Sequence, residues 1–157
     1  MSPAKHVIAS GVTSVVFMVL FKSWAGAVAC FLSGILIDVD HLWDFYLGTK
    51  KISFSVQELD DFCSRDEKGG KLYLFFHSYE FLAVLWGIVF YSQFSPVLTG
   101  IVLGMSVHLL LDQITNAVYP WAYFFFYRAR FGFPQEVFFK ERFLKRFVCA
   151  NETSYEK

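Results

Sequence analysis

Four long apolar stretches, separated by polar connections, dominate the pattern of the chain. They cover residues 7–21, 24–37, 72–91 and 96–115. Between Val7 and Ile37 only Lys22 is charged, and no Asp, Glu, Lys or Arg occurs from Phe81 to Leu111. Such tracts are typical of membrane helices, although the first two are shorter than the ~20 residues that a perpendicular span needs. We therefore predict an all-α integral membrane bundle of about four helices.

A basic amphipathic pattern closes the chain. Phe139, Phe143 and Phe147 recur at every fourth position, and Lys or Arg residues fill many of the positions between them. This pattern predicts an interfacial helix on an anionic membrane surface, with an ordinary surface helix packed on the protein's own core as the alternative. We expect two parts: a membrane helical domain over residues 1–130 and a basic interfacial tail over residues 131–157.

Charge is distributed unevenly although the net charge is zero. The neutral balance and the lack of a nucleic-acid-binding motif argue against a nucleic acid partner. If all four segments span, every one of the 14 Lys and Arg residues except Lys22 falls on one side of the bilayer. The positive-inside rule then predicts a multi-pass protein of the cell membrane with both termini in the cytoplasm.

The ionisable residues of the apolar segments cluster near that same side. Three His residues have carboxylates nearby: His41 directly follows Asp38-Val39-Asp40, Glu80 comes three residues after His77, and Asp112 comes four residues after His108. Residues three or four apart share a face of a helix. The topology puts these groups, together with His6 at the start of the first segment, in one layer. It also puts His77 about 8 Å into the third helix.

Buried carboxylates need a positive partner, and the third and fourth segments contain no Lys or Arg. A cation bound by carboxylates and neutral imidazoles would meet that need. The mixed nitrogen and oxygen donors suit Zn²⁺ best, with Mn²⁺ or Fe²⁺ as alternatives. We predict one or two ions, held by residues drawn from all four segments: His6, Asp38, Asp40, His41, His77, His108 and Asp112.

Individual members of this set have simpler interpretations. His6 alone could be an ordinary surface residue, and His77 alone could be a buried side chain bonded to a helix carbonyl. Glu80 could be a base, a ligand or a hydrogen-bond partner of His77. For catalysis, we expect Glu80 or Asp40 to move a proton at the site.

Four sequence blocks resemble the YdjM-like family of predicted inner-membrane, metal-dependent hydrolases, described as LexA-regulated or LexA-binding. They are Lys5-His6-Val7-Ile8-Ala9-Ser10, Ile35-Leu36-Ile37-Asp38-Val39-Asp40-His41, His77-Ser78, and the Gly-x3-Gly-x3-His-x3-Asp pattern from Gly100 to Asp112. The similarity covers about residues 5 to 125. It implies an inner-membrane location and a metal-dependent hydrolase activity, and it names no substrate.

Three functional hypotheses follow from the sequence. The first is a hydrolase that acts on a phosphoester or ester bond of a lipid-like substrate, because the site would lie at the depth of lipid headgroups. The second is a metal-ion carrier or sensor, which would need a polar path to the far side. The third is a structural membrane protein whose metal only holds helices together, which predicts a closed coordination shell.

Overall fold

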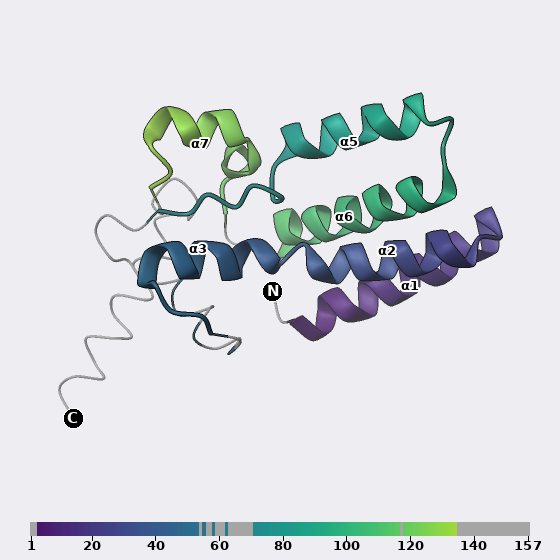
Figure 1. Cartoon of the computed structure of the whole chain (residues 1–157), viewed down its shortest axis with the longest axis horizontal. Helices are drawn as coiled ribbons and strands as arrows, with labels where there is room; N and C mark the ends of the chain where they lie inside the picture. Colours follow the sequence, from purple (N-terminus) through teal and green to yellow (C-terminus); the bar gives the residue numbers. More distant parts are fainter. Residues whose placement is uncertain are drawn as a thin grey trace. The chain divides into compact units, whose positions relative to one another are not determined.

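The computed structural model describes residues 3–53, 55, 58, 62, 71–116 and 118–134. Within these ranges the protein is all-helical, as predicted, and contains no β-strand (Figure 1). The chain divides into two compact units, residues 1–38 with 76–116 and residues 39–75 with 117–157. The predicted boundary at residue 130 falls within the second unit. From residue 135 onward, the predicted interfacial tail lies outside the described residues.

The first unit consists of α1 (Pro3–Phe21), α2 (Trp24–Leu36), α5 (Tyr79–Tyr91) and α6 (Pro96–Thr115). The α6 helix packs against the other three (Figure 1). Local chemistry sets the boundary between α1 and α2: Lys22 adopts a left-handed φ of 50°, and the Ser23 hydroxyl accepts a hydrogen bond from the Gly26 amide at 3.2 Å. A serine at this position satisfies a backbone N–H that the first helical turn leaves without a partner.

The helix predicted from the third apolar segment, α5, begins later than the apolar pattern predicts. Its first residue is Tyr79, and Ser78 is the N-cap, with its hydroxyl accepting from the Phe81 amide at 3.3 Å. His77 therefore precedes the helix, and the prediction that His77 lies within it and shares a helical face with Glu80 was wrong. Residues 72–75 are apolar because they are partly buried in the second unit. The hydrophobic pattern alone could not distinguish such a buried non-helical segment from a helical turn.

Small residues allow α2 and α6 to pack backbone against backbone. A Cβ atom at Gly100 would overlap the carbonyl of Gly26, and one at Gly104 would overlap the carbonyl of Cys30. The Ser33 hydroxyl also donates to the Ile101 carbonyl at 2.9 Å. Close approach through Gly and interhelical hydrogen bonds from Ser are typical of helix contacts in membranes.

Three helical stretches are long and apolar enough to cross a membrane: Ala4–Phe21, Trp24–Thr49 and Pro96–Thr115. The second of these runs through α2 and on into α3 (Val39–Thr49). The α5 helix is apolar but has only 13 residues. On α1, Val15, Val19 and Leu20 are each 65–70% exposed, which gives this helix an apolar outer face. These features indicate association with a membrane.

The second unit contains α3, the 3-10 helix η1 (Pro120–Tyr123) and α7 (Phe125–Phe131). Its centre is the backbone of Tyr73 and Leu74. The fully buried guanidinium of Arg128 donates to the carbonyl of Tyr73 at 2.5 Å and to that of Leu74 at 3.1 Å. The Asp44 carboxylate on α3 accepts from the Leu74 amide at 3.0 Å. Two buried charged side chains thus bind the backbone of this short segment: Asp44 accepts from its N–H group, and Arg128 donates to its carbonyl groups.

Candidate metal centre

Five of the predicted ligands meet at one end of the first unit. His6 lies near the start of α1, Asp38 directly follows α2, His77 directly precedes the N-cap of α5, and His108 and Asp112 lie near the end of α6. Helices that alternate in direction bring these positions together, because the start of one helix then lies beside the end of the next. The expectation that separate segments deliver ionisable groups to a common site is met for these five residues.

Two imidazole nitrogens and two carboxylate oxygens lie close to one another in this cluster. His108 Nε2 lies 3.2 Å from Asp38 Oδ1 and 3.3 Å from Asp112 Oδ2. His77 Nε2 lies 3.5 Å and 3.7 Å from the same two oxygens. A tetrahedral ion with nitrogen and oxygen donors at 2.0–2.2 Å separates neighbouring donor atoms by about 3.3–3.6 Å. These four separations are close to that range. The described residues that could hold an ion form two groups of three that share His108: His6 with His108 and Asp112, and Asp38 with His77 and His108.

The orientation of the His108 ring makes Nε2 an electron-pair donor. Its Nδ1 lies 2.7 Å from the carbonyl oxygen of Gly34 on α2. Because a carbonyl can only accept, Nδ1 carries the proton, and the neutral ring has its lone pair on Nε2. This Nε2 is fully buried and makes no hydrogen bond with any described residue, although two carboxylate oxygens face it. A backbone partner for the remote nitrogen is the usual arrangement of a metal-binding histidine.

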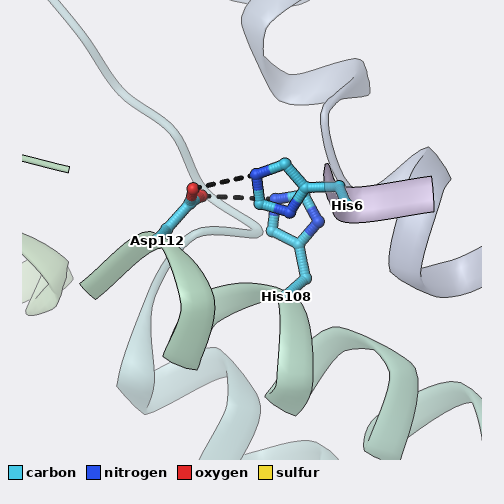
Figure 2. A group of neighbouring side chains, drawn as sticks. All are labelled: His6, His108 and Asp112. Carbon is cyan, nitrogen blue, oxygen red and sulfur yellow. Dashed lines mark ion pairs between the residues drawn. The ribbon is translucent and has the colours of Figure 1, made fainter. Parts of the chain in front are cut away.

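The carboxylate of Asp112 presents its two oxygens to different partners. Oδ1 accepts from the side-chain amide of Asn116 at 2.8 Å and lies 3.1 Å from His6 Nε2. Oδ2 faces His108 and His77. Figure 2 shows the rings of His6 and His108 lying over one another, both directed toward Asp112. Their centroids are 3.9 Å apart and their planes differ by 18°.

The first unit has few basic residues beside the carboxylates of this cluster. The first unit contains Lys5 and Lys22 as its basic residues, and both are exposed. Asp112 is buried, and the Asp38 side chain is 43% exposed. Two electrostatic states would stabilise the carboxylates: ion pairs with protonated histidines, or a bound cation with neutral histidines. The described cluster could hold a metal ion, and measurement of bound metal distinguishes the two states.

Three predicted site residues are outside this group. Asp40 and His41 belong to α3 of the second unit, where Asp40 is buried and His41 half-buried. Glu80 lies in the first turn of α5, half-buried, and is not one of the residues grouped as possible ligands. Their roles as ligands or proton acceptors stay predictions.

Sequence reasoning missed two residues that contact the cluster. Gly34 contributes its backbone carbonyl, a group that every residue has and that the sequence therefore cannot single out. Asn116, the C-cap of α6, follows Asp112 by four positions, and that spacing was a usable signal because it is about one helical turn. Both residues hold a predicted ligand in one orientation.

Comparisons of the chain with protein-family models, with curated proteins and with solved structures find no match. The resemblance of its sequence blocks to the YdjM-like family accordingly stays a prediction.

Proposed function

We propose that the protein is a membrane-embedded, metal-dependent hydrolase. The observation that carries the proposal is a cluster of His6, His77, His108, Asp38 and Asp112, whose ligand atoms form two groups that could each hold an ion. These residues would hold the ion, and Zn²⁺ suits their mixture of nitrogen and oxygen donors best, with Mn²⁺ or Fe²⁺ as alternatives. A bound ion would supply Lewis acidity and a lowered pKa for a water molecule.

Unequal burial of the ligands favours a reactive site over a purely structural one. The side chains of His77, His108 and Asp112 are at most 7% exposed, whereas that of Asp38 is 43% exposed. A structural site surrounds its ion with protein donors, while a catalytic site keeps one position open to substrate. The Asp38 side of the cluster is the route by which a substrate would arrive.

The substrate class follows from the location of the cluster at one end of apolar helices. If these helices span the inner membrane with both termini in the cytoplasm, the cluster lies at the cytoplasmic headgroup layer. A phosphoester or ester bond of a lipid-like molecule would then reach it. Glu80, three residues after His77, is the candidate in the first unit for accepting a proton during hydrolysis, and Asp40 is the alternative.

Metal analysis of the purified chain tests the proposal. We expect one zinc per chain in the wild type and a loss of zinc in Asp112→Asn and in His108→Gln. Gln113→Asn is a matched control, because Gln113 is next to Asp112 but bonds Tyr79 and is not among the grouped ligands. Turnover of a panel of phospholipids and lipid esters should disappear together with the zinc. A wild-type protein that binds no divalent metal would refute the proposal.

A variant of Glu80 separates catalysis from metal binding. We expect Glu80→Gln to keep its zinc and to lose at least 100-fold in turnover, which is the lower range of the contribution of a general base. Zinc binding without hydrolysis of any lipid in the wild type would instead favour the carrier, sensor or structural alternatives.

A further inference from the structure

We infer that the cluster holds two metal ions and that the carboxylate of Asp112 bridges them, one ion on each oxygen. The first ion would bind Asp38, His77 and His108, and the second would bind His6. The inference rests on the proposed function and concerns the number of ions at the same site. It can therefore fail while the hydrolase proposal stands.

The two groups of possible ligands have one histidine in common. His108 is grouped with His6 and Asp112, and it is also grouped with Asp38 and His77. Its Nδ1 lies 2.7 Å from a backbone carbonyl oxygen, so Nε2 is the nitrogen that it offers to an ion. One imidazole nitrogen has one lone pair and binds one ion. If both groups are filled, a residue with two donor atoms must therefore connect them.

Asp112 has two such donor atoms, and its two oxygens face different histidines. Oδ1 lies 3.1 Å from His6 Nε2, whereas Oδ2 lies 3.3 Å from His108 Nε2 and 3.7 Å from His77 Nε2. The side-chain amide of Asn116 donates to Oδ1 at 2.8 Å and uses one of the two lone pairs of that oxygen. The other lone pair can bind an ion. A buried carboxylate placed in this way between two sets of nitrogen donors can serve one ion through each oxygen.

The stacked rings of His6 and His108 direct their nitrogens to two neighbouring positions. The ring planes differ by 18°, the centroids are 3.9 Å apart, and both rings are directed toward Asp112 (Figure 2). An imidazole nitrogen binds an ion in the plane of its ring, where its lone pair lies. Two nearly parallel rings that face the same way therefore place two ions side by side, about one ring spacing apart. Two-metal sites hold their ions about 3.5–4 Å apart, which agrees with this spacing.

The two ions would differ in how completely the protein surrounds them. The first would have Asp38, His77, His108 and Oδ2 of Asp112 as donors, which are enough to fill a tetrahedral shell. The second would have His6 and Oδ1 of Asp112, and its remaining positions would be open to water or substrate oxygens. We therefore expect the first ion to stay bound during purification, as the one zinc per chain expected above. The second ion should bind when zinc is added.

Dialysis of the purified full chain against rising concentrations of free zinc, followed by metal analysis, tests the inference. We expect the wild type to reach two zinc ions per chain and His6→Gln to stop at one. Lys5→Gln is the matched control, because Lys5 is exposed and next to His6, and this variant should still reach two. X-ray absorption at the zinc edge of the fully loaded wild type should show a zinc–zinc separation of about 3.5–4 Å, which His6→Gln should lack.

A wild type that saturates at one zinc, or that binds two zinc ions without this separation, would overturn the inference and leave the proposed hydrolase intact. A second zinc retained by His6→Gln would also overturn it, because that zinc would then be an adventitious ion bound elsewhere. A wild type without zinc would instead refute the proposed function. The wild-type measurements need no variant, so they decide the question even if His6→Gln fails to fold.

Discussion

The imidazole of His108 on α6 is hydrogen-bonded through Nδ1 to the backbone carbonyl of Gly34 on α2, at 2.7 Å. This bond links the most buried candidate ligand to a helix 74 residues away in the sequence. The same glycine lacks a side chain because Ser10 of α1 fills that space: a Cβ atom at Gly34 would lie 2.5 Å from the Ser10 hydroxyl oxygen. The orientation of the ligand therefore depends on how closely three helices pack.

A methyl group at this contact should weaken metal binding without altering a ligand. In Gly34→Ala the new Cβ displaces α1 or shifts α2, and the carbonyl moves away from His108 Nδ1. We expect zinc affinity to fall by about tenfold or more, as for other changes that release a ligand from its supporting hydrogen bond. Isothermal titration calorimetry of the detergent-purified chain with zinc measures this affinity.

The control for this variant is Gly87→Ala on α5, where an added Cβ meets no atom within 4 Å. It should keep wild-type zinc affinity. Equal affinity in Gly34→Ala and Gly87→Ala would show that the Gly34 contact has no influence on the site.

The close contact between α2 and α6 should be sensitive to one added carbon. Gly100→Ala places a Cβ atom onto the backbone of Gly26, which cannot rotate away. Overpacking of this kind costs about 1–3 kcal/mol. Gly11→Ala, whose Cβ would meet Phe31 at 3.9 Å, should cost far less. Unfolding of both variants in mixed micelles compares the two, and similar stabilities would contradict the packing described.

Arg128 should be essential to the second unit. Arg128→Met keeps the apolar stem and removes two hydrogen bonds to the carbonyls of Tyr73 and Leu74. The two carbonyls and the Asp44 carboxylate would stay buried without the guanidinium, so we expect the free energy of unfolding to fall by about 2–5 kcal/mol. Hydrogen exchange measured by mass spectrometry should show faster exchange in peptides covering residues 71–75.

The exposed neighbour Arg130 provides the comparison for Arg128. Arg130→Met should leave exchange in residues 71–75 at the wild-type rate. If the Arg128 and Arg130 variants exchange alike, the buried guanidinium does not stabilise this segment.

Membrane topology can be tested by labelling single cysteines in intact cells. In a chain with Cys30, Cys63 and Cys149 replaced by serine, a cysteine at Ser92 lies in the connection between α5 and α6, and one at Lys51 follows α3. The asymmetry of Lys and Arg predicts that an impermeant maleimide reaches position 92 from outside and position 51 only after cell disruption. The reverse pattern would invert the topology and move the metal cluster to the other face.

Much of the fold could be read from hydrophobic periodicity and helix-boundary residues. The apolar runs ending at Phe21 and Thr115 coincide with the ends of α1 and α6. The third run was the exception, because Leu72 and Leu74 are buried without being helical and Ser78 caps the helix after them. Burial makes a residue apolar in either conformation, so hydropathy could not locate that boundary.

The sequence by itself determined that carboxylates and imidazoles lie near the ends of apolar segments. Its charge pattern indicated that the carboxylates needed a cation, because the third and fourth segments contain no Lys or Arg. Only the tertiary structure decided which of them meet. It grouped His6 with His108 and Asp112, and Asp38 with His77 and His108. It also directed the Nδ1 proton of His108 to the carbonyl of Gly34. Such assignments depend on how closely the helices approach one another, and helix packing sets those distances while residue type does not.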